Sequence, residues 1–167
     1  MNEGLIIGII IGISIASVPL IFAAIGELLV ERSGVLNLGV EGMMIVGALA
    51  GFVVEFHTGS SFLAVLAALL AGMAIASIFA FLTQILLTNH VATGLALTLF
   101  GLGIAAFIGR GYSEENIQLI SAIHIPLLSD FPIVGPLLFS YNPLVYLAFF
   151  MVFLVWWFLF TFRSRSV

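Results

Sequence analysis

The sequence predicts an all-α protein, a polytopic transmembrane helical bundle of about five spans. Of its 167 residues, 63% are hydrophobic and only 7% are charged, whereas a soluble domain carries about a quarter charged residues. The mean hydropathy is +1.34, and apolar runs recur at the length that a hydrocarbon core of ~30 Å requires. So few charges could not cover a water-facing surface, so a soluble helical domain is excluded.

The composition also excludes several functions. The four basic residues are all Arg, and a phosphate-binding P-loop requires a Lys, so the chain cannot be a P-loop ATPase by itself. The net charge of −4 is unlike the basic face of a nucleic-acid-binding protein. There is no Cys, and His57, His90 and His124 share no ligand spacing. Neither a metal site nor an intramembrane enzyme is therefore expected.

The first span is predicted from about Leu5 to Ile25. The chain starts without the positive residues of a signal peptide, so we expect this helix to be retained. Pro19 lies inside the run and should kink the helix or mark a local break. Small residues recur at every fourth position and predict a face for close helix packing, namely Gly4, Gly8, Gly12 and Ala16.

The segment Glu31–Met44 interrupts the apolar pattern. The apolar run that follows, from Met43 to Val54, has 12 residues, or about 18 Å of helix, which is too short to cross a bilayer. Either the helix starts earlier, near Ser33, or the segment is a Gly-rich broken or re-entrant one. Transport proteins place their working residues in such polar, Gly-broken segments at the mouth of a span.

Asn37 and Glu41 are the candidate residues of a translocation path or gate. If the helix starts early, they lie at i and i+4 on one face. A charge at the bilayer centre costs about 2.5–3.5 kcal/mol, so Glu41, the only acidic residue expected at depth, should face protein or water. The alternative is structural, with Glu41 capping the backbone at a helix start. Three glycines are expected to permit an irregular backbone here: Gly34, Gly39 and Gly42.

Three more spans are predicted, from about Phe62 to Leu87, from Val91 to Ile108 and from Pro143 to Phe162. The polar segments Glu55–Ser61 and Thr88–His90 are expected to be turns. Small residues on both sides of the first turn predict helix packing, and hydroxyls inside a span usually bond to their own backbone. The packing residues are Gly47, Gly51, Ala64, Ala68, Gly72, Ala76 and Ala80, and the hydroxyls are those of Thr93 and Thr98.

The long connection from Arg110 to Asn142 is expected to carry a short helix that Ser113 caps and that ends near Ser121. Its Pro-rich part, residues 125–139, is expected to lie on or dip into the membrane interface. The positive-inside rule places the N-terminus outside and the C-terminus in the cytoplasm. Arg32, Arg163 and Arg165 fall on the cytoplasmic side; Arg110, Glu3, Glu55, Glu114, Glu115 and Asp130 fall on the other.

The segment Glu31–Met44 closely resembles the segment after the first span in permease subunits of bacterial ABC importers. The group is the branched-chain amino acid/ribose permease superfamily, and within it the nucleoside and simple-sugar permeases. Asn89–Leu97 and the Pro-rich run with Asn142–Tyr146 resemble the same group. The resemblance covers essentially the whole chain. Such permeases are nearly twice as long, so residues 1–167 are expected to be one incomplete transmembrane permease domain, an N-terminal half.

The resemblance implies a multi-pass subunit of the bacterial cytoplasmic (inner) membrane that forms a translocation path for nucleosides or simple sugars. It implies no enzyme activity and no cofactor in this chain, with ATP and Mg²⁺ on separate ATPase subunits. A second permease subunit and an extracytoplasmic substrate-binding protein are the other implied partners. Glu31 and Arg32 are expected to pair or to face the ATPase, and Asn89 and His90 are weaker candidates on the same cytoplasmic side.

A second function stays open at this point. A small secondary transporter or channel protomer could use Glu41 to couple transport to an ion or a proton, because ionisable residues within a membrane usually have a function. Whether uptake requires ATP would distinguish an ABC importer subunit from a secondary transporter or channel.

Overall fold

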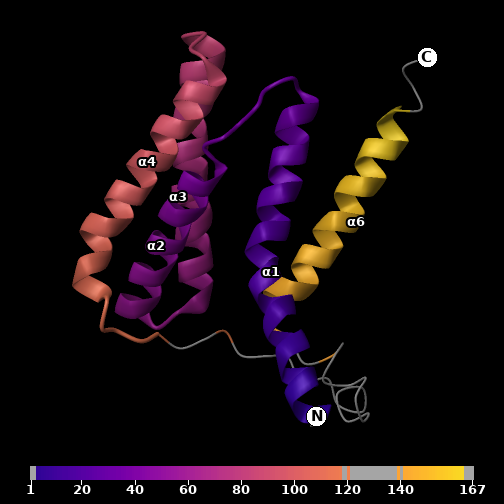
Figure 1. Ribbon diagram of the computed structural model, residues 1–167, viewed down its shortest axis with the longest axis vertical. Coiled ribbons are helices and arrows are strands. Elements are labelled where there is room, and N and C mark those ends of the chain that lie inside the picture. The colour runs from indigo at the N-terminus through magenta and orange to yellow at the C-terminus, as the bar shows by residue number, and fades with distance from the viewer. Residues whose placement is uncertain (1–2, 118–119, 121–138, 140, 164–167) are drawn as a thin grey trace. The chain divides into compact units, whose positions relative to one another are not determined.

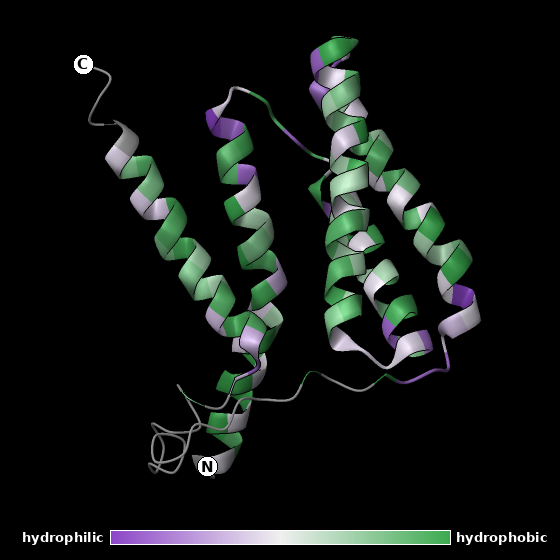
Figure 2. Ribbon diagram, turned by 180° about the vertical axis from the view of Figure 1, so that it is seen from behind, coloured by the Kyte–Doolittle hydropathy of each residue, from purple (hydrophilic) through white to green (hydrophobic). Residues whose placement is uncertain are grey.

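The computed structural model describes residues 3–117, 120, 139 and 141–163, and nearly all of these lie in helices (Figure 1). Within these residues five helices are long and apolar enough to cross a membrane, which confirms the predicted all-α polytopic class. Apolar residues run along the helices and hydrophilic ones gather near their ends (Figure 2). The chain divides into two compact units, Met1–Gly26 with Ile120–Val167, and Glu27–Leu119; each is described by itself.

The first unit contains most of helix α1, Glu3–Arg32, and helix α6, Pro143–Arg163. Its core joins Val18 of α1 to Val145 and Ala148 of α6. Helix α1 is 30 residues long, about 45 Å, and continues past the predicted end at Ile25. Pro19 lies inside α1 without ending it.

The small residues of α1 have no helix against them in the described chain. A Cβ added at Gly4, Gly8 or Gly12 would have no atom within 4 Å among the described residues. The packing face that these glycines form is thus open here, and a helix that packs on it stays a prediction.

The second unit is a three-helix body. Helices α2, Val40–Thr58, α3, Ser61–Ala80, and α4, His90–Gly109, lie side by side (Figure 1). Helix α3 continues into a π-helical turn η1, Phe81–Ile85, and α4 into a 3-10 turn η2, Arg110–Tyr112. The core joins three residues of α3 and α4, against which Val35, Met43 and Val46 pack; the three are Ile75, Phe79 and Leu97.

Helices α2 and α3 pack through the small residues that the sequence pattern predicted. A Cβ added at Gly47 would lie 3.1 Å from the carbonyl oxygen of Ala68, and one at Gly51 would lie 3.2 Å from that of Ala64. Because only small residues allow two helices to approach so closely, the predicted packing of this pair is confirmed.

The turn between α2 and α3 is shorter than predicted. The helix runs to Thr58, and Gly59 ends it with a left-handed φ of 63°. Glu55 lies inside the helix, where it is buried, and its Oε1 accepts a hydrogen bond of 3.1 Å from the Ser61 hydroxyl. The polar sequence had suggested that the helix ends at Glu55. The helix instead continues past this residue to Thr58.

The predicted helix after Ser113 is wrong over the residues that the structure describes there. Ser113 and Glu114 form a turn, and no helix covers Glu115–Ile117. The Ser113 hydroxyl donates instead to the Arg110 carbonyl at 3.2 Å, so it closes the preceding turn rather than capping a new helix. The Pro-rich segment 125–139, apart from residue 139, lies outside the described residues.

Candidate functional site: the turn between α1 and α2

The segment Ser33–Gly39 joins α1 to α2. Gly34 has a φ of +85°, a left-handed conformation that L-residues with a side chain rarely adopt. Its N–H bonds to the Glu31 carbonyl at 2.9 Å, and the Ser33 hydroxyl donates to the Val30 carbonyl at 2.6 Å. Helix α1 therefore ends at a glycine-dependent cap.

Helix α2 begins at Val40 and runs unbroken for 19 residues, about 28 Å and close to the bilayer core. Of the two alternatives, an early start near Ser33 is wrong, because the helix extends the 12-residue apolar run by residues 40–42 at one end and residues 55–58 at the other. The described residues show no re-entrant segment in its place. Asn37 lies in the turn before the helix. The predicted i, i+4 helical face of Asn37 and Glu41 is therefore also wrong.

Asn37 is buried and braces this turn. Its side-chain Oδ1 accepts a hydrogen bond of 2.9 Å from the Gly39 N–H. Its Nδ2 lies 3.7 Å from the Met43 sulfur. Because α2 has not yet begun, no helical carbonyl is available to the Gly39 N–H, and the Asn side chain takes that place.

Glu27 is a functional candidate that the sequence reasoning missed. Its Oε1 accepts a hydrogen bond of 3.0 Å from the Asn37 backbone N–H, and its buried Oε2 has no hydrogen-bond partner among the described residues. Oε2 of Glu55 is likewise buried and unpartnered there. Among the described residues, the unpartnered carboxylate oxygens buried in the fold therefore belong to Glu27 and Glu55, whereas Glu41 is exposed. A carboxylate inside an apolar run was the available signal.

Glu41 lies in the first turn of α2 and is exposed on the chain. Within the described residues its carboxylate makes no hydrogen bond to backbone, so a cap does not explain it. A negative charge near a helix N-terminus is stabilising by about 0.3–1 kcal/mol at an exposed site. The side chain is thus free to face a partner or a water-filled path.

Helices α2 and α4 touch through the backbone of their glycines. A Cβ added at Gly42 would lie 2.6 Å from the Leu97 carbonyl oxygen, and one at Gly101 would lie 2.7 Å from that of Gly42. A Cβ added at Gly94 would lie 2.8 Å from the Gly39 nitrogen. Gly42 is inside a regular helix, so close approach rather than irregular backbone requires a glycine there.

Thr98 also joins the turn to α4. It was expected to bond to its own helix, but its hydroxyl donates to the Leu38 carbonyl at 2.9 Å. Leu38 belongs to the irregular segment, where no helical N–H reaches this carbonyl. The expectation fails because the glycine contact brings that unsatisfied acceptor within reach of α4.

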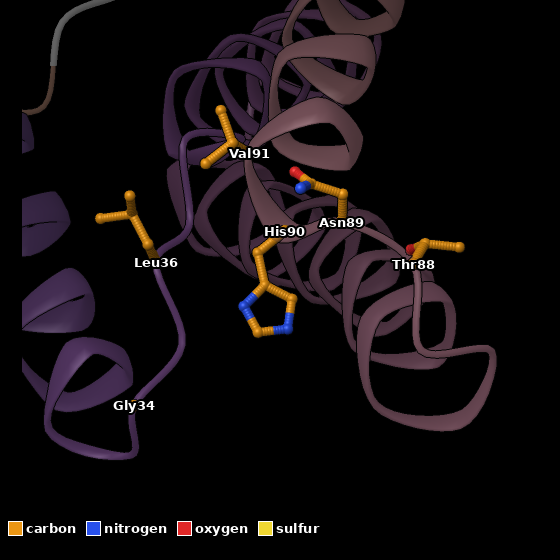
Figure 3. A pocket seen from close by; sticks show the side chains of 6 residues that line it. All are labelled: Gly34, Leu36, Thr88, Asn89, His90 and Val91. Atoms are coloured by element: carbon orange, nitrogen blue, oxygen red, sulfur yellow. The ribbon is translucent and has the colours of Figure 1, made fainter.

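The four cytoplasmic-contact candidates lie near this turn. Asn89 caps α4, since its Oδ1 accepts from the Ala92 N–H at 3.0 Å. A hollow of about 370 Å³ is lined by Gly34, Leu36 and residues 88–91, and Figure 3 shows the His90 side chain beside it. Glu31 and Arg32 are both exposed and form no ion pair with each other in the described part, so of the two expected roles only contact with the ATPase stays a prediction.

The residues that line the hollow come mainly from two of the three stretches that carry the family resemblance, Glu31–Met44 and Asn89–Leu97. A comparison with protein families matches residues 9–162 to the branched-chain amino acid transport system / permease component family. The chain belongs to this permease family. No solved structure matches the chain.

Three curated proteins are similar to this permease-family chain. A nucleoside ABC transporter permease of Lactococcus lactis subsp. cremoris is 32% identical and covers 95% of the chain. A guanosine ABC transporter permease of Bacillus subtilis is 32% identical over 89% of it. A Haloferax volcanii protein is 43% identical over 87% of the chain. Its name gives glucose ABC transporter permease as a provisional assignment. The chain spans 45%, 55% and 52% of the Haloferax, Lactococcus and Bacillus proteins, about half their length.

Proposed function

We propose that this chain is a membrane-spanning part of an ATP-driven ABC importer for nucleosides or simple sugars. The family match over residues 9–162 carries the proposal. The names of the relatives, which cite a nucleoside, guanosine and glucose, support the solute class. In this proposal the chain forms part of a translocation path, and separate ATPase subunits bind ATP and Mg²⁺. Further permease spans and an extracytoplasmic binding protein complete the machine.

The turn Ser33–Gly39 is the proposed working segment. Its irregular backbone follows α1 directly and precedes a span, so it acts as the broken segment at the mouth of the path. Asn37 braces the segment from inside, while the exposed Glu41 faces the solute or water. A carboxylate turned to lipid would be costly, which supports this direction for Glu41.

The hollow beside this turn is the proposed side of ATPase contact. Glu31 and Arg32 end α1, and Asn89 and His90 begin α4. We place this end in the cytoplasm and the N-terminus outside, because Arg32 belongs to the more Arg-rich side. The membrane is the bacterial cytoplasmic membrane.

A secondary transporter stays the second candidate, and two buried carboxylates favour it. Oε2 of Glu27 and Oε2 of Glu55 have no partner among the described residues, and such groups within a membrane often bind ions or protons. Glu41, the residue first assigned to coupling, is exposed instead.

Solute uptake by the assembled importer tests the proposal. The complete permease that contains this chain is reconstituted into proteoliposomes with its ATPase subunits and binding protein. Radiolabelled guanosine, uridine, glucose, ribose and leucine are offered with ATP inside the vesicles. We expect uptake of a nucleoside or a sugar, and of no labelled amino acid. Uptake of a branched-chain amino acid alone would contradict the solute class.

A further inference from the structure

The segment Val35–Gly39 is held by two helices and a core. Thr98 of α4 binds its Leu38 carbonyl, and Val35 packs against the core of the second unit. Helix α1 reaches it through Glu27, whose carboxylate binds the Asn37 N–H ten residues ahead. The link from α1 to the middle of the segment therefore depends on a side chain that the family resemblance does not explain.

A second side-chain hydrogen bond extends this connection from Asn37 to Gly39. The Glu27 Oε1 accepts from the Asn37 N–H, and the Asn37 Oδ1 accepts from the Gly39 N–H. Each polar side chain thus satisfies a donor that has no helical carbonyl available, until α2 begins at Val40. A buried backbone donor without an acceptor is costly, so loss of the first acceptor should loosen the segment.

We propose that Glu27 is a positioning residue that holds Asn37 in the transport segment and that it acts as a hydrogen-bond acceptor rather than as a charge. Asn37 is its link to transport, so that part of the proposal rests on the proposed function. The geometric part does not, because the contact from Glu27 to Asn37 exists whatever the solute.

The acceptor role and a charge role make opposite demands on residue 27. Glu27→Gln removes the charge but keeps an Oε1 that accepts from the Asn37 N–H. Glu27→Met keeps the length and the helix propensity but loses the oxygen acceptor, and Glu27→Ala removes the side chain. An ion- or proton-coupling carboxylate would fail in the Gln variant, whereas a positioning acceptor would fail only in the Met and Ala variants.

Two readouts are measured on the complete importer in proteoliposomes. The chain contains no Cys, so Val35→Cys provides a single thiol in this chain, and its maleimide labelling rate reports how well the segment is seated on the core. Any Cys in the partner subunits is replaced beforehand. The second readout is the maximal uptake rate, normalised to the amount of importer. Glu114→Ala is the matched control, since Glu114 is exposed in a turn.

In the Met and Ala variants we expect the Val35→Cys thiol to label about fivefold faster or more, and maximal uptake to fall by a similar factor. In the Gln and control variants both should stay within about twofold of the parent. The Met variant decides the result if the Ala variant does not reach the membrane, and the Gln variant decides the charge question in either case.

Three possible results distinguish failure of the positioning role, failure of the acceptor role and failure of the proposed function. Slow labelling in both the Met and Ala variants would overturn the positioning role. Loss of uptake in the Gln variant with parent-like labelling would assign Glu27 a charge role and overturn the acceptor role. If the parent importer takes up neither nucleoside nor sugar, the proposed function fails, while the labelling rates still decide whether Glu27 positions Asn37.

Discussion

The hydroxyl of Thr98 in α4 donates a hydrogen bond of 2.9 Å to the carbonyl oxygen of Leu38, sixty residues earlier in the chain. This bond fastens the irregular turn before α2 to the first half of α4. The glycine contacts on either side bring the two backbones close enough for it to form. The candidate site is thus built on the α2–α4 contact.

Replacing Thr98 tests this bond directly. Thr98→Val keeps the side-chain shape but removes the donor, so it should lower stability by about 0.5–1.5 kcal/mol. Thermal unfolding of the purified permease in detergent measures the loss. Thr98→Ser keeps the hydroxyl and should retain most of the stability; equal losses in the Val and Ser variants would show that the bond contributes nothing.

The contact between Gly42 and Gly101 should not tolerate a methyl group. In Gly101→Ala the new Cβ would meet the Gly42 carbonyl oxygen at 2.7 Å, so the helices must separate at a cost of about 1–3 kcal/mol. The amount of folded permease in the membrane and its melting temperature should both fall. Gly103→Ala, in the same helix, has no atom within 4 Å of its new Cβ and should be neutral or mildly stabilising.

The left-handed backbone at Gly34 should penalise alanine even though space is open there. A Cβ added at Gly34 would meet no atom within 4 Å, but its φ is +85°, and a non-Gly residue in this region costs about 1–3 kcal/mol. We expect Gly34→Ala to lower the melting temperature. Gly26→Ala lies within α1, also in open space, and should not lower it; a similar loss in both variants would exclude backbone strain as the cause.

Variants of Glu41 and Asn37 should distinguish a residue that lines the translocation path from one that stabilises the turn. Glu41→Gln should lower stability by no more than the about 0.3–1 kcal/mol that the charge contributes at the helix N-terminus, because the exposed carboxylate has no hydrogen bond in the described part, but it should reduce maximal uptake. Asn37→Ala removes the acceptor for the Gly39 N–H and should lower stability by about 1–3 kcal/mol as well as uptake. Normal uptake and expression in the Glu41→Gln variant would rule out a charged role for Glu41.

The spans could be predicted from the sequence because hydrophobic runs and small-residue spacing act locally. Gly47 and Gly51 repeat at four-residue spacing, and the helix that they face carries Ala64 and Ala68 at the same spacing. The end of α2 could not be predicted, because Glu55 is polar in sequence yet buried through a bond to Ser61 on the next helix. Local polarity does not report such a tertiary partner.

The position of the irregular segment could be predicted from the sequence, but most of the contacts that hold it could not. The glycines and Asn37 mark an irregular segment, and Gly34 has the conformation that only glycine adopts easily. The reason for Gly42 lies in α4, more than fifty residues away. Glu27 lay hidden in an apolar run, because its partner is a backbone N–H, which no sequence pattern displays.

The central claim is that ATP drives transport through this permease. The most direct measurement compares two conditions in proteoliposomes that contain the complete importer. One supplies ATP with the proton gradient collapsed by an ionophore, and the other imposes a proton gradient without ATP. We expect nucleoside or sugar uptake only with ATP. Uptake that follows the gradient and persists without ATP would contradict the account and favour a secondary transporter.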